Sequence, residues 1–196
     1  MIEQWRSHLA EVQQRVELAT ECKFGKMKVL PSYRMLNGYF SCALNCSSSK
    51  RRMQIIADLI EALTISTAIA AVIPEIDPHT IYIYKTSAIH SHGAYSFILA
   101  HEFGHLAMAR NLHHFGVLMA ELDGIGEHYA NYIARNVTPE LSCDEIEKRF
   151  PAAYMDLKSC DELLKREKIK TPAEFLTYIH NRYQIHPLLL SCTEAH

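Results

Sequence analysis

Apolar residues in the first twenty positions recur every three or four residues. They are Ile2, Trp5, Leu9, Val12 and Val16. This spacing puts them on one face of a helix, so the sequence predicts a first helix over about residues 2–20. The segment that follows, through Tyr39 and Phe40, has no clear period, and we expect it to hold one or two strands.

The middle of the chain opens with a long apolar stretch. Its pattern predicts a helix from about Lys50 to Val72, with the region of Pro74 as its exit. The next segment, residues 80–86, is rich in β-branched and aromatic residues and predicts a strand. Within it Ile81 and Ile83 alternate with tyrosines, so one face of this strand is apolar.

The second half of the chain reads as helical. One run covers about residues 94–114 and ends near Gly116, which suits a left-handed helix end, and another covers about residues 125–136. Ser142–Glu145 and Thr171–Glu174 each place a hydroxyl at a helix start and a glutamate three residues on. We therefore expect the C-terminal third to be all helical.

These elements predict an α+β domain that is mainly helical, with a small sheet just before the helix of residues 94–114. The chain has 196 residues, of which 48% are hydrophobic and 21% charged, values that are ordinary for a folded protein with a real core. We find no internal repeat and no long linker, so residues 1–196 are expected to form a single domain.

Charge and hydropathy argue against two kinds of partner. The formal net charge is −2 and the basic residues are spread along the chain, which gives no electrostatic footprint for nucleic acid. The most apolar stretch, residues 55–73, contains Asp58 and Glu61, so a buried helix is favoured over a membrane span. The start lacks the apolar block of a signal peptide, and the six cysteines lack the spacing of a disulfide scaffold. We expect a cytoplasmic protein with free thiols.

The run HEFGH at residues 101–105 indicates a metal-binding site. His101 and His105 are four apart, so on a helix both imidazoles lie on one face and can reach one Zn²⁺. Glu102 is rotated by about 100° around the helix from His101. It is therefore placed beside a water at the metal, in the role of general base.

A hydrolytic zinc needs a third protein ligand and an open position. The pair His113–His114 misses the register of the Met-turn type of zinc peptidase, so the ligand is sought on a second helix. Glu127 is the leading candidate, with Glu121 and Asp123 as fallbacks. Asn131, one turn after Glu127, is expected to hydrogen-bond either the outer nitrogen of a ligand histidine or the backbone next to it.

The segments FILAHEFGH (residues 97–105) and EHYANYIA (residues 127–134), followed by Pro139, resemble gluzincin-type zinc peptidases, most closely the ImmA/IrrE family. The resemblance covers about residues 80–140. It implies a zincin-like domain with Zn²⁺ bound by His101, His105 and Glu127. It also implies Glu102 as the catalytic base and a protein substrate, often a transcriptional regulator.

The sequence thus leads us to expect a zinc-dependent endopeptidase in which Glu102 activates a water at the zinc to hydrolyse peptide bonds. The strand at residues 80–86 could pair with an extended peptide along a free edge, or that edge could be covered by other parts of the chain. A tyrosine or histidine should stabilise the oxyanion, with His90 and His92 the first to test. The other candidates are Tyr84, His128, Tyr132, His180, Tyr183 and His186.

Two other classes of function stay open at this point. A regulatory or interaction protein could keep a structural zinc, which a fourth ligand such as His128 or a cysteine would close. A bacterial or phage effector could direct the same hydrolytic site at a protein of its host. The sequence does not predict the oligomeric state or the substrate.

Overall fold

The computed structural model describes most of the chain in seven stretches. These are residues 2–35, 43–45, 52–53, 69–73, 77–84, 91–112 and 124–183. The helices within them are α1 (Ile2–Thr20), α4 (His92–Leu112), α6 (Ile125–Val137), α7 (Cys143–Arg149), α8 (Pro151–Glu167) and α9 (Pro172–Arg182). The strands are β1 (Lys28–Pro31), β2 (Ala70–Ile73) and β3 (Asp77–Ile83), and Ser32–Arg34 form a 3₁₀ turn, η1. The fold is mainly helical with a small sheet, as predicted.

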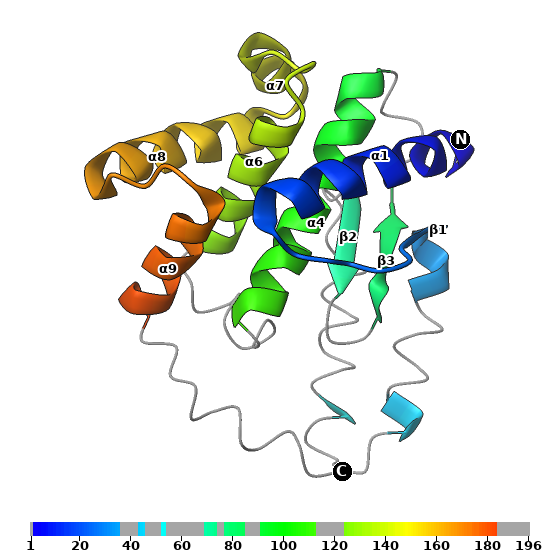
Figure 1. The fold of residues 1–196 in the computed structure, drawn as a ribbon. Coiled ribbons are helices and arrows are strands. Elements are labelled where there is room, and N and C mark those ends of the chain that lie inside the picture. Colours follow the sequence, from blue (N-terminus) through cyan, green and yellow to red (C-terminus); the bar gives the residue numbers. More distant parts are fainter. Residues whose placement is uncertain are drawn as a thin grey trace.

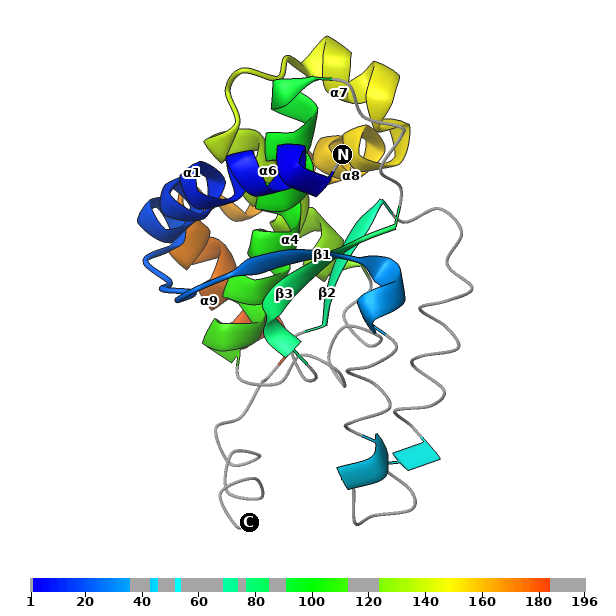
Figure 2. The same cartoon turned by 90° about the vertical axis from the view of Figure 1, so that its right-hand side faces the viewer.

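Helix α4 runs through the middle of the molecule. The sheet packs on one side of it and α6 on another, while α1 crosses over both (Figures 1 and 2). Its residues 94–100 are all buried, because they face neighbours on every side. A helix that is apolar all round is typical of such a central position. No helix in the stretches given above is long and apolar enough to cross a membrane.

The sheet has the order β1-β3-β2, with β1 parallel and β2 antiparallel to β3. The apolar side chains Ile81 and Ile83 are buried against the core. The predicted strand is thus confirmed with shifted bounds: it begins at Asp77 and not at Thr80, and it ends at Ile83, while residues 85–86 lie outside the described parts. The alternative in which it has a free edge is wrong, since β3 is bonded on both sides. The edge strand nearest α4 is β2.

The helix predicted over Lys50–Val72 is wrong at its end. Ala70, Ala71 and Val72 belong to strand β2 and pair with β3. The four apolar residues Ala70–Ile73 do not by themselves distinguish helix from strand, and the pairing with β3 decides the outcome. Residues 50–51 and 54–68 of that prediction lie outside the described parts, as do Tyr39 and Phe40 of the earlier segment.

The remaining helices begin and end close to the predicted residues. Helix α1 covers residues 2–20 as expected, α4 starts two residues earlier than expected, and α6 extends one residue further. Both predicted capping boxes are present, at Ser142 with Glu145 and at Thr171 with Glu174. These short-range signals worked because a cap depends only on residues within one turn.

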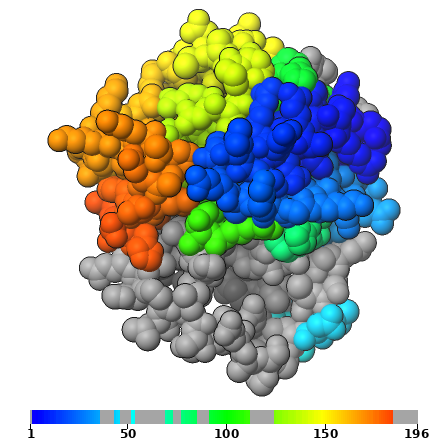
Figure 3. Space-filling model, viewed as in Figure 1, coloured from blue at the N-terminus to red at the C-terminus, as the bar shows by residue number. Residues whose placement is uncertain are grey.

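Helix α1 is fastened to the rest of the molecule by its buried face. Trp5, Val12 and Val16 enter the core, and the ring of Trp5 meets Tyr95 of α4 edge to face at 4.8 Å. Helix α1 packs against α9, and on the surface its blue atoms adjoin orange atoms of the C-terminal region (Figure 3). The N-terminal and C-terminal helices therefore share one face of the molecule.

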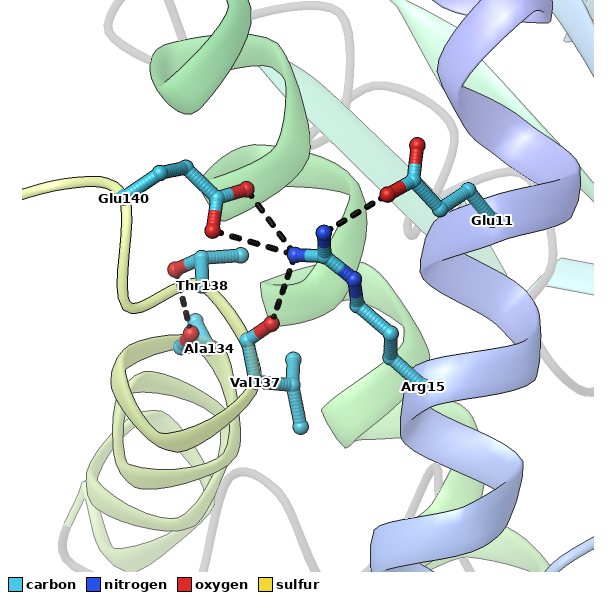
Figure 4. Close-up of polar contacts among 6 residues, drawn as sticks. All are labelled: Glu11, Arg15, Ala134, Val137, Thr138 and Glu140. Carbon is cyan, nitrogen blue, oxygen red and sulfur yellow. Dashed lines mark hydrogen bonds and ion pairs between the residues drawn. The ribbon is translucent and has the colours of Figure 1, made fainter.

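A second contact, made by ion pairs and hydrogen bonds, joins α1 to the end of α6 (Figure 4). Arg15 donates to the backbone oxygen of Val137 at 3.1 Å and to both carboxylate oxygens of Glu140 at 3.0 Å. Its other terminal nitrogen donates to Glu11 at 2.6 Å. A cation at the C-terminal end of a helix also suits the helix dipole.

We expect Arg15→Met to reduce the free energy of unfolding by about 1 kcal/mol, because charge-assisted hydrogen bonds are lost and the Val137 carbonyl loses a donor. Arg6→Met is the matched control, since among the described residues Arg6 pairs with Glu3 alone, on the exposed surface of the same helix. It should change stability by a few tenths of a kcal/mol at most. Urea unfolding measures both, and equal losses would show that Arg15 does no more than a surface ion pair.

Candidate metal centre

Helix α4 brings two imidazoles together at the edge of a cavity. His101 and His105 are one turn apart, and their Nε2 atoms are 3.0 Å from each other with the rings nearly perpendicular. The side chains are largely buried, with 18% and 9% exposed. The predicted juxtaposition on one helix face is therefore present.

Glu127, in the first turn of α6, completes the group. One carboxylate oxygen lies 3.3 Å from Nε2 of His101, and the other lies 3.3 Å from Nε2 of His105. Among the described residues, this is the group of histidine, cysteine and carboxylate side chains whose ligand atoms converge, all within 4.8 Å of one another. Two nitrogens and one oxygen form a donor set that suits a divalent metal such as zinc.

Close approach of α4 and α6 makes this convergence possible. A Cβ placed on Gly104 would lie 2.7 Å from Cα of Ala130 and 3.2 Å from its Cβ. Only a glycine on α4 and a small residue on α6 let the two backbones come this near. Since Glu127 is three residues before Ala130, the contact sets its distance to the histidines.

The electrostatics of the group favour a positive charge at its centre. Burial by itself lowers the pKa of His101, but the hydrogen bond to Glu127 and the charge of Glu102 outweigh it and raise the pKa to about 9. Burial would raise the pKa of Glu127, yet its bonds to His101 and His105 hold it far below the usual range. A cation is therefore stabilised between these side chains.

Glu102 lies beside the group but is not a member of it. Its side chain is buried, and one carboxylate oxygen accepts a hydrogen bond from the backbone N–H of Val72 in β2 at 2.9 Å. Burial raises the pKa of Glu102, an effect that His101 and His105 partly offset. Because a carboxyl with a raised pKa both takes and returns a proton more readily near neutral pH, the environment suits a general base.

Asn131 is where the sequence predicted it to act. Its Oδ1 lies 2.9 Å from Nδ1 of His101, the outer nitrogen of that ring, and the asparagine is 1% exposed. The prediction of this contact is confirmed. Asn131 has a second partner, which no sequence motif indicated. Its Nδ2 donates a hydrogen bond to Asp156 of α8 at 3.4 Å.

The site opens into a cavity of about 650 Å³. Three parts of the fold line it: residues 69–72 leading into and along β2, the side chains of α4 and α6 around the histidines, and residues 149–153 with Asp156 at the start of α8. The walls are mostly apolar, with Phe97, Ile98 and Phe150 prominent. Size and lining are typical of a ligand site.

Several other predicted site residues do not join this group. His128 and the described cysteines, Cys22, Cys143 and Cys160, are not among its converging atoms. None of the oxyanion candidates that the structure describes lines the cavity; these are Tyr84, His92, His128, Tyr132, His180 and Tyr183. The other two oxyanion candidates, His90 and His186, lie outside the described residues. So do the residues considered as alternative metal ligands, which are His113, His114, Glu121 and Asp123.

Fold and site together define a mainly helical α+β protein with a three-residue group that could hold a metal ion beside a buried glutamate. Comparison of the chain with protein-family models, with curated proteins and with solved structures gave no match.

Proposed function

We propose that the chain is a zinc-dependent endopeptidase with a zincin-like domain, similar to the ImmA/IrrE family. The observation that carries the proposal is the convergence of His101, His105 and Glu127 next to the buried, non-ligating carboxylate of Glu102. A metal with an open coordination position beside a carboxylate base is the arrangement that hydrolysis requires.

In this proposal Nε2 of His101, Nε2 of His105 and the carboxylate of Glu127 hold the zinc. The bound metal supplies Lewis-acid polarisation of the scissile carbonyl and acidifies the attacking water. Glu102 accepts the proton of that water and delivers it to the leaving nitrogen. The amide bond breaks, and a carboxylate and an amine are released.

A peptide substrate is supported by the wall that β2 contributes. Residues 69–72 line the cavity, and β2 is an edge strand of the described sheet. An extended chain can add to such an edge through backbone hydrogen bonds, with apolar side chains entering the cavity. A transcriptional regulator as the natural substrate rests on the family resemblance alone.

The alternative of a purely structural zinc has less support. A closed site needs a fourth protein ligand, and no fourth histidine, cysteine or carboxylate converges on the group among the residues that the structure describes. Cleavage activity discriminates between the two functions.

Elemental analysis tests the metal directly. Protein purified without added metal should carry about one zinc per chain, and His105→Ala and Glu127→Ala should each weaken zinc binding on the order of 100-fold or more, beyond the effect of an outer partner. Glu121→Ala and Asp123→Ala serve as matched controls and should bind as the wild type does. Full zinc affinity in Glu127→Ala, or its loss in a control, would contradict the ligand set.

A further inference from the structure

Three side chains from three helices form a line that ends on His101. Asp156 of α8 accepts a hydrogen bond from Nδ2 of Asn131 on α6 at 3.4 Å, and Oδ1 of the same amide lies 2.9 Å from Nδ1 of His101 on α4. Asn131 is 1% exposed and Asp156 half-buried. Asp156 itself is not among the atoms that converge on the metal group.

The chemistry of these groups fixes the direction of each bond. An ionised carboxylate can only accept hydrogen bonds, so the amide must turn its Nδ2 toward Asp156. Its Oδ1 then faces the ring, and a carbonyl oxygen also only accepts. Nδ1 of His101 must therefore carry a proton, and Nε2, which faces His105 and Glu127, is the nitrogen left to bind a metal. That is the tautomer a metal needs at this nitrogen.

Without the carboxylate, the amide has no fixed direction. Rotated by half a turn, it would offer Nδ2 as a donor to Nδ1 of His101 and so favour the tautomer with its proton on Nε2. A protonated Nε2 cannot bind a metal. The carboxylate on α8 thus selects between a ring that is ready for a metal and one that is not.

Contacts on both sides of Asp156 fix the position of α8. Arg135 of α6 donates two hydrogen bonds, of 2.9 and 2.8 Å, to Asp161, which is five residues further along α8. At the start of α8, Phe150 stacks on Phe97 of α4 with ring centroids 5.4 Å apart. Asp156 therefore sits between two contacts that fix α8 against both ligand-bearing helices.

We propose that Asp156 is a positioning residue that orients the Asn131 amide and thereby sets the tautomer of His101 for metal binding. This inference rests on the proposed zinc site. It concerns a residue that is not among the converging ligand atoms, so its effect on metal binding passes through Asn131.

Zinc affinity, measured by competition with a chromophoric chelator, tests the inference. Asp156→Leu should weaken zinc binding by about 10–100-fold, the usual effect of an outer partner of a ligand histidine. The exchanged pair Asn131→Asp with Asp156→Asn should bind at least as tightly as the wild type. Its carboxylate, now on α6, accepts directly from His101, and its amide, now on α8, donates to that carboxylate. In the zinc-loaded protein, the ¹H–¹⁵N signal of His101 Nδ1–H should be present in the wild type and the exchanged pair.

Asp161→Leu is the control for a merely structural role, because it removes a carboxylate from the same helix and loosens its anchor. It should lower the melting temperature and weaken zinc binding far less than Asp156→Leu does, because the stacking of Phe150 on Phe97 still holds the start of α8. Equal weakening by Asp161→Leu would overturn the inference, as would wild-type affinity in Asp156→Leu. If Asp156→Leu does not fold, more than about tenfold loss in the exchanged pair overturns it. A wild-type protein that binds no zinc would instead refute the proposed function, and the inference with it.

Discussion

Glu102→Gln is expected to lower kcat/KM for peptide cleavage by about 10²–10⁴-fold, the usual contribution of a general base. The amide has no basic site for the proton of the attacking water. It keeps the size of the side chain, and its oxygen can still accept from Val72 N–H, which now bonds the carboxylate at 2.9 Å. Zinc content and melting temperature should therefore stay at wild-type values.

The measurement needs a substrate that the wild type cleaves, and a peptide library read by mass spectrometry supplies one. Glu145→Gln is the matched control, since a glutamine there preserves the capping box at the start of α7. It should cleave at the wild-type rate. Near wild-type cleavage by Glu102→Gln would remove Glu102 from the mechanism while leaving the metal site intact.

Gly104→Val should cost about 3 kcal/mol or more in the free energy of unfolding. The new Cβ would meet the backbone of Ala130 at 2.7 Å, and a backbone atom cannot turn away as a side chain can. Helices α4 and α6 must then separate, and overpacking of this kind is costly. Because Glu127 is part of α6 and the two histidines are part of α4, the separation should also weaken zinc binding.

Gly93→Val is the control for this prediction, because it makes the same change in the first turn of the same helix. A Cβ there meets side-chain atoms of Leu141 and Glu140 at 3.3 and 3.5 Å, which are able to move. Its cost should be at most about 1 kcal/mol. Thermal and urea unfolding of both variants decide the matter, and equal costs would mean that the α4–α6 approach is not tight.

The local features of this fold were predictable from the sequence, and the non-local ones were not. The periodic face of α1 and the capping boxes at Ser142 and Thr171 depend on neighbours within a turn or two, and they came out as predicted. The strand state of β2 and the central place of β3 depend on pairing between segments up to about fifty residues apart. No local pattern encodes such a pairing.

The same division holds for the site. His101, Glu102 and His105 form a local motif, and the spacing of Glu127 and Asn131 on one helix face pointed to their shared role. Asp156 was missed because it lies 25 residues beyond its partner and belongs to no motif. The sequence did contain one signal. Asp156 lies four residues before the buried Cys160, so its carboxylate is near the apolar face of α8. A polar group in that position wants a partner.

The cavity has two parts: the residues of the proposed reaction, and an apolar wall that would contact a ligand. The proposed reacting groups lie within residues 101–131, whereas part of the apolar wall lies within residues 149–153, on another pair of helices. Substitutions of Ala152 and Ala153 would reshape the space offered to a ligand while keeping the contact of Phe150 with Phe97. Selection, or an engineer, could therefore retarget this scaffold by altering a handful of neighbouring codons, provided that Asp156 is kept.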